Sequence, residues 1–182
     1  SVNTADEFTD LLEKIISDEF TEDFWGIQLA NDLATSSSRS PSLLAYYASL
    51  NILDAPGLFS NLKVVELLRA GIRAKKSALE RHHLFPKAYL YRTGITALQD
   101  TNQIANFALV EWSDNIDISD KKPSEYIGDY KSRFGAQELA NMYRLHGLPE
   151  SWEQMEYSDF IEIRRKNIAK IIYEAYTKVA GL

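Results

Sequence analysis

Cysteine is absent from this chain of 182 residues. Disulfide bonds and thiolate zinc sites are therefore excluded, and a reducing, cytoplasmic location is expected. Long apolar runs are lacking as well. The uncharged stretch 40–53 is too short and too rich in serine to cross a bilayer, so no membrane partner is expected. A glycine-rich phosphate loop, an internal repeat and a low-complexity tract are also missing from the sequence.

What remains is the composition of one globular domain. Hydrophobic residues make up 45% of the chain and charged residues 25%, both ordinary values. The length is sufficient for one domain, 1–182, with a substantial core. Because the chain begins at Ser1 without a signal peptide, we expect a fragment whose upstream domain is absent.

The charge is distributed unevenly. The net charge is −6, but residues 61–92 hold eight basic side chains and two acidic ones, a local charge of +6 against −12 elsewhere. An acidic total argues against nucleic acid, whereas a local basic stretch favours it. The alternative is a solvated helix face followed by a charged loop.

Helical periodicity dominates both ends of the chain. The amphipathic pattern and its capping residues predict helices over 4–16, 23–34, 41–53, 61–70, 123–134, 136–146 and 157–180. In the last helix, the apolar spacing predicts a buried face made of Phe160, Ile163, Ile168, Ile171, Ile172 and Ala175. We interpret residues 1–70 as a helical lead-in and 128–182 as C-terminal helices.

Between the helical blocks the pattern changes to two short strands. The segments 78–85 and 102–112 are short, with aromatic or β-branched residues at their apolar positions, and the connection 87–101 joins them. The expected fold is therefore mainly α, a helical bundle that carries a small strand–strand insert.

Two of only three histidines, His82 and His83, stand together in this insert. A neutral imidazole can accept a proton from water near neutral pH, and imidazole nitrogen or asparagine oxygen can bind a divalent cation. Asn106 and Asn115 follow in the second half of the insert, in the order His–Asn–Asn. These residue types suit phosphodiester hydrolysis, in which a bound cation neutralises charge on the phosphate.

The segment "ERHHLFPKAYL…NQIANFALVEWSDNIDISDKKPSEYI" resembles the ββα-metal (HNH, or His-Me finger) nuclease motif. More narrowly, it resembles the version at the C-terminus of GmrSD-type restriction endonucleases and related DNA-nicking phage-defence proteins. The motif spans 78–127, and the segment "SPSLLAYYASLNILDAPGLFSNLKVVELL" is similar to the helical lead-in of those proteins. The resemblance implies a metal-dependent DNA endonuclease, working beside an upstream nucleotide-hydrolysing domain.

The resemblance also implies a role for each motif residue. His83 would be the general base, His82 and Asn115 the metal ligands, and Asn106 a structural asparagine that holds the loop and orients His83. Many members have aspartate where this chain has His82, so the cation could be magnesium or manganese, with cobalt and nickel as further candidates. The phosphate-binding cations would be Lys75, Lys76, Arg81 and Lys87.

Other interpretations remain open at this point. Adjacent strand residues point to opposite faces, so His82 and His83 can share a site only if the strand ends or twists there. Asn102 is predicted to be a turn residue, and His146 a C-terminal helix cation or an exposed residue. Asp114, Asp117 and Asp120 are interpreted as solvated loop carboxylates, with Asp114 as the one auxiliary ligand candidate. The rival function is a non-catalytic helical interaction or DNA-docking module.

Overall fold

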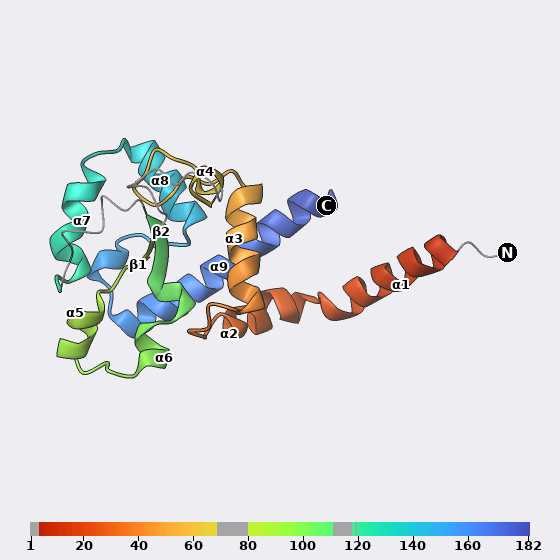
Figure 1. Cartoon of the computed structure of the whole chain (residues 1–182), viewed down its shortest axis with the longest axis horizontal. Helices are drawn as coiled ribbons and strands as arrows, with labels where there is room; N and C mark the ends of the chain where they lie inside the picture. The colour runs from red at the N-terminus through yellow and green to blue at the C-terminus, as the bar shows by residue number, and fades with distance from the viewer. Residues whose placement is uncertain (1–3, 69–79, 111–117, 119) are drawn as a thin grey trace.

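The computed structural model describes residues 4–68, 80–110, 118 and 120–182 of the chain (Figure 1). The described part is mainly helical and carries one small antiparallel sheet of two strands. Before the sheet come α1 (Thr4–Glu19), the π-helical turn η1 (Phe24–Gln28), α2 (Leu29–Asp32), α3 (Pro41–Ile52) and α4 (Val64–Leu68). After it come α7 (Pro123–Lys131), α8 (Ala136–Leu145), η4 (Trp152–Gln154) and α9 (Tyr157–Ala180).

The strands are shorter than predicted and their connection is helical. β1 spans Glu80–His83 and β2 spans Phe107–Val110. Between them lie α5 (Lys87–Arg92), α6 (Leu98–Thr101) and the 3-10 turn η2 (Ile104–Asn106). The predicted strand over 102–112 is therefore wrong for residues 102–106, while residues 111–112 lie outside the described part of the chain.

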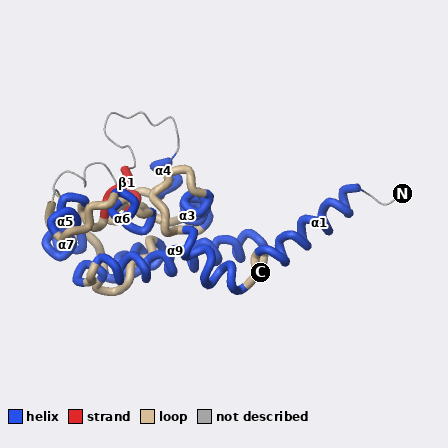
Figure 2. Tube along the Cα trace, turned by 90° about the horizontal axis from the view of Figure 1, so that it is seen from below, coloured by secondary structure: helices blue, strands red, loops and turns tan. Residues whose placement is uncertain are grey.

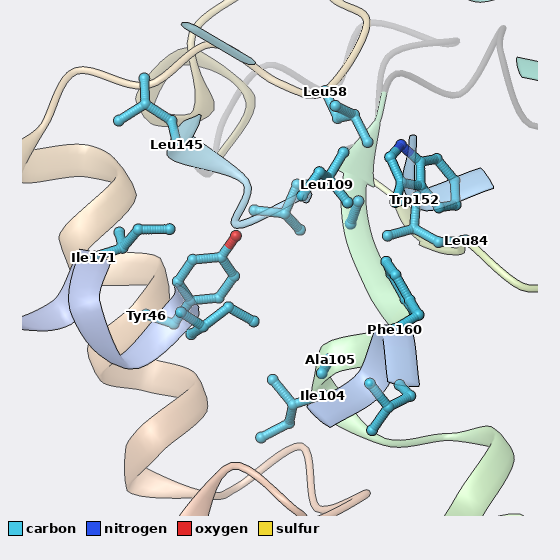
Figure 3. Close-up of a cluster of buried hydrophobic side chains, with 14 of the residues drawn as sticks. Tyr46, Leu58, Leu84, Ile104, Ala105, Leu109, Leu145, Trp152, Phe160 and Ile171 are labelled. Atoms are coloured by element: carbon cyan, nitrogen blue, oxygen red, sulfur yellow. The ribbon is translucent and has the colours of Figure 1, made fainter. Parts of the chain in front are cut away.

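α9 is the element on which the rest of the body packs. Figure 1 shows it running beneath the sheet and crossing α3, and Figure 3 shows side chains from both helices meeting those of β2. Phe160 of α9 is fully buried, and its ring centroid lies 4.9 Å from that of Phe85, just after β1. Ile163 is an error in the predicted buried face, because it is exposed while the neighbouring Ile161 is buried. Core packing thus holds the segment just after β1, at Phe85, against α9.

A buried arginine links α9 to the insert. Arg164 is fully buried, and its Nε donates to the carbonyl of His146 at 3.0 Å. Its Nη1 donates to the carbonyl of Ala105, in η2, at 2.6 Å. A guanidinium is costly to bury unless its N–H groups find acceptors, so these bonds hold η2 at one place against α9.

His146 follows α8 and is fully buried, which corrects the prediction that it is an exposed residue or a cation. Its Nε2 donates to the carbonyl of Pro56 at 2.8 Å. Burial lowers the pKa of His146 to about 4, and the nearby Arg164 acts in the same direction. The imidazole is therefore neutral in the folded protein at neutral pH.

Among the described residues, no helix combines the length and the apolar character that crossing a membrane would require.

His146 makes the stability depend on pH. In the unfolded chain it takes up a proton near pH 6.5, but in the folded chain only near pH 4. The unfolded state therefore binds more protons between these values, and stability falls as the pH is lowered through them. We expect this group to remove on the order of 3 kcal/mol of unfolding free energy by pH 4, measurable by urea unfolding at several pH values. In His146→Gln that part of the pH dependence should vanish; an unchanged slope would contradict the assignment.

Candidate functional site

The hairpin register places the two adjacent histidines on opposite faces of the sheet. His82 pairs with Ala108 and His83 with Phe107. Both histidines belong to the regular strand β1, so the strand does not end early enough to turn their side chains the same way. Their surroundings differ accordingly, and the structure does not bring the two rings to one site.

His82 faces the core. It is buried, and its ring stands edge-on to Tyr126 of α7, with centroids 6.4 Å apart. The small apolar pocket beside it is lined by Leu58, Phe59, Leu84, Val110, Ile118, Tyr126 and Tyr130. Among the described residues, this lining offers no carboxylate, amide or second imidazole beside His82.

His83 lies on the other face and is half-buried. Its Nε2 is 2.9 Å from Oδ1 of Asn102, which directly follows α6. An amide oxygen can only accept a hydrogen bond, so Nε2 carries the proton and the lone pair of the neutral ring is on Nδ1. Asn102 is therefore a partner of His83, not merely the predicted turn residue. The sequence carries no local signal for this contact, because two short helices separate the residues.

Two cations accompany His83. Arg81 lies two residues earlier on the same face of β1, and its Cζ is 4.1 Å from the centroid of the Phe107 ring. The His83 ring contacts the same phenylalanine, at 4.2 Å between centroids. Lys87, the first residue of α5, has its Nζ 5.4 Å from the Tyr91 ring. Lys75 and Lys76, also predicted to bind phosphate, lie outside the described residues.

These surroundings set the protonation of His83. Partial burial lowers its pKa below the usual value, and the positive charges of Lys87 and Arg81 lower it further, while the hydrogen bond that His83 donates to Asn102 raises it. The balance leaves the ring neutral at neutral pH. A half-exposed neutral imidazole with a directed lone pair can accept a proton from a bound water.

Asn106 joins the segments that carry His83 and Asn102. It is fully buried; its Oδ1 accepts a hydrogen bond from the amide of Phe85 at 2.9 Å. Its Nδ2 donates to the carbonyls of Phe85 at 3.0 Å and Thr101 at 2.9 Å. These are the contacts that a loop-bracing asparagine makes, since they tie the exit of β1 to the end of α6.

The metal site predicted from sequence does not form among the described residues alone. Asn115, with Asp114 and Asp117, lies outside them. Within them, no three His, Cys, Asp or Glu side chains are grouped so as to hold a metal ion. His82 is the one predicted ligand that the structure describes, so the predicted pair of ligands cannot be compared with it. We therefore assign no chemical step to a metal.

Asn106 should be important for stability. In Asn106→Ala, the amide of Phe85 and the carbonyls of Phe85 and Thr101 lose a buried partner. We expect the unfolding free energy from urea titration to fall by at least roughly 1–3 kcal/mol. Asn31→Ala, at an exposed position of α2, is the matched control and should change it by less than about 0.5 kcal/mol. Equal stability of the two variants would show that Asn106 does not brace the loop.

Compared with known proteins, this chain matches no family model, no curated protein and no solved structure. The resemblance to the HNH motif therefore rests on the motif residues themselves.

Proposed function

We propose that this chain is an endonuclease domain that hydrolyses phosphodiester bonds in DNA, with His83 as the general base. The observation that carries the proposal is the hydrogen bond between His83 Nε2 and Asn102 Oδ1. It leaves the Nδ1 lone pair available on a half-exposed ring, beside two cations that suit a phosphate.

In the proposed reaction, His83 Nδ1 takes a proton from water as the water oxygen bonds to phosphorus, and the bond to the 3′ oxygen breaks. A general base contributes most when its pKa is close to the working pH, and a lowered histidine pKa keeps the base unprotonated at neutral pH. Arg81 and Lys87 would contact phosphate oxygens, which position DNA without reading its sequence.

We further propose that β1, β2 and α7 are the ββα unit of an HNH-type insert. α7 lies against the hairpin through Tyr126, whose hydroxyl donates to the carbonyl of Leu84 at 2.6 Å. In the resembled nucleases a divalent cation neutralises charge on the phosphate. We therefore propose that cleavage requires a divalent cation, with His82 and Asn115 as its predicted ligands. The setting that the resemblance implies is restriction of foreign DNA beside a nucleotide-hydrolysing domain.

His83→Ala tests the proposal directly. We expect the rate of nicking of supercoiled plasmid to fall by roughly 10²–10⁴-fold, because a positioned general base contributes this much. Circular dichroism should show a folded protein, since the half-exposed ring makes one side-chain hydrogen bond. Asn31→Ala is the control and should cleave like the unmodified chain.

The same assay with magnesium, manganese, cobalt or nickel, and after chelation, tests the cation. Activity that survives chelation would remove the cation from the proposal. Full cleavage by His83→Ala would remove the general base. Absence of cleavage under every condition, with DNA binding retained, would favour the non-catalytic docking module.

Asn102 should set the pH dependence of the reaction. In Asn102→Asp a carboxylate faces Nε2 in place of the amide oxygen, and a negative charge there raises the pKa of His83. The base must be unprotonated to act, so the acidic limb of the pH–rate profile should move to higher pH. Asn31→Asp adds the same charge on α2, away from His83, and should leave the limb in place. A purely structural role for Asn102 would lower the rate without moving the limb.

A further inference from the structure

α1 ends beside a hollow that is lined by aromatic rings. The rings belong to Phe20 and Trp25, which follow α1, and to Tyr173 and Tyr176 near the end of α9. The other residues that line this aromatic hollow are Glu13, Ile16, Ser17, Glu22, Ala180 and Leu182. Figures 1 and 2 show α1 leaving the body here and extending away from it, so the hollow lies at the base of a projecting helix.

The four rings hold one another in place. The ring centroid of Trp25 lies 5.3 Å from that of Phe20, 5.0 Å from that of Tyr173 and 4.9 Å from that of Tyr176. The indole Nε1 of Trp25 donates to the carbonyl of Phe20 at 3.2 Å, which fixes the orientation of the ring. Tyr173 is still 45% exposed and Phe20 39%. The hollow therefore offers aromatic surface that is formed before a ligand binds.

The aromatic hollow is negatively charged. Glu13 and Glu22 line it, and no described basic residue does. Among the described residues, neither carboxylate has an ion-pair partner. Lys178, near the end of α9, donates to the carbonyl of Ile52 instead. Aromatic faces and carboxylates attract the same kind of ligand, a cation, and among protein side chains arginine is the one that stacks on such rings most often.

The apolar face of α1 is continuous with the aromatic hollow. Five large apolar residues recur at helical spacing along the helix, and between 40% and 61% of each is exposed: Phe8, Leu11, Leu12, Ile15 and Ile16. Ile16 also lines the hollow, so the two surfaces meet at this residue. Because helices in proteins are stabilised mainly by packing of their apolar face, this face suits an apolar partner.

Carboxylates border the apolar face on both sides. α1 holds six acidic residues and Lys14 as its one basic residue. At about 100° per residue, Asp6 and Glu13 project along one edge of the face, and Glu7 and Asp18 along the other. A partner that fits this face must therefore combine apolar residues with positive charge, which a second α1 does not.

We propose that α1 and the aromatic hollow together bind a basic amphipathic helix of a partner protein, with an arginine side chain of that helix in the hollow. The apolar residues of the partner would pack on the apolar face of α1. The guanidinium would lie against the Tyr173 ring and donate hydrogen bonds to Glu13 and Glu22. Anionic lipid head groups do not fit the same surface, because its carboxylates repel them. The inference does not rest on the proposed nuclease function, and its test measures binding alone.

Calorimetric titration of the whole chain with a synthetic peptide tests the chemistry of the partner. The probe is a helical peptide of about 18 residues, with leucine at helical spacing and arginine along both edges of the leucine face. We expect this arginine peptide to bind. The same peptide with glutamate in place of arginine should bind at least about tenfold more weakly. No binding of the arginine peptide, or equal binding of the two peptides, would overturn the proposal.

Glu13→Gln combined with Glu22→Gln tests the hollow. This pair should weaken binding of the arginine peptide at least about fivefold, because the guanidinium loses both carboxylates. Asp129→Asn combined with Glu150→Gln is the matched control. It removes the same charge from exposed positions outside the hollow, and it should change the affinity less than about twofold. Equal effects of the two pairs would show that the peptide responds to net charge and not to the hollow, against the proposal.

Tyr173 tests the aromatic contribution. Tyr173→Leu keeps an apolar side chain but removes the ring, so the arginine peptide should bind about two- to fivefold more weakly. Tyr173→Phe keeps the ring and should bind the peptide like the unmodified chain. If these two variants bound the peptide equally well, the arginine would not lie on the ring and the placement in the hollow would be wrong.

Two measurements address other occupants of the same surface. Vesicles that contain phosphatidylserine should not carry the chain with them on sedimentation, because the carboxylates of α1 are repelled by anionic head groups. Sedimentation velocity of the chain without peptide should show no self-association that Leu12→Glu abolishes. Binding to the vesicles, or self-association lost in that variant, would assign the surface to a membrane or to a second copy and overturn the proposal.

Discussion

The hydrogen bonds between the Asn106 side chain and the backbone of Phe85 are the constraint on which the candidate site depends. One backbone bond, from the Leu84 amide to the Asn106 carbonyl, continues the pairing past β1. At Phe85 the Asn106 side chain takes over, because its Oδ1 accepts from the Phe85 amide and its Nδ2 donates to the Phe85 carbonyl. The third bond, to Thr101, fixes the end of α6 to the same point. Because Asn102 follows Thr101, this constraint sets its side chain opposite His83.

Buried contacts from α9 hold in place the two segments that the Asn106 side chain joins. Arg164 donates to the carbonyl of Ala105, the residue before Asn106, and Phe160 packs on the ring of Phe85. Both contacts are buried. The polar one fixes Ala105 and the apolar one fixes Phe85, so each of the two segments is held against α9. The geometry of the proposed base therefore depends on a helix more than fifty residues away in sequence.

The alternation of the strand separates two histidines that the sequence presents as a pair. His83 gains a hydrogen-bond acceptor and neighbouring cations, whereas His82 is set among aromatic and aliphatic side chains. Identical side chains one residue apart thus have different hydrogen-bond partners and different exposure. His146 gives a third case, in which full burial holds the imidazole neutral as a purely structural donor.

Sequence by itself determined the elements whose signals are local. Apolar periodicity and terminating residues were enough for the bounds of α3, α7, α8 and α9 to within a few residues. The HNH-like order of residues led to His83 and to Asn106, and Asn106 makes bracing contacts of the expected kind. These features depend on residues that are close in sequence or on a motif with fixed order.

Only the tertiary structure decided what depends on distant contacts. The partner of His83 is Asn102, placed by two short helices, α5 and α6, that the sequence did not predict. The exposure of Ile163 and the burial of His146 follow from which side of each helix meets the core, which periodicity alone cannot specify. Local patterns depend on neighbours along the chain, whereas burial and hydrogen-bond partners depend on how those elements pack in space.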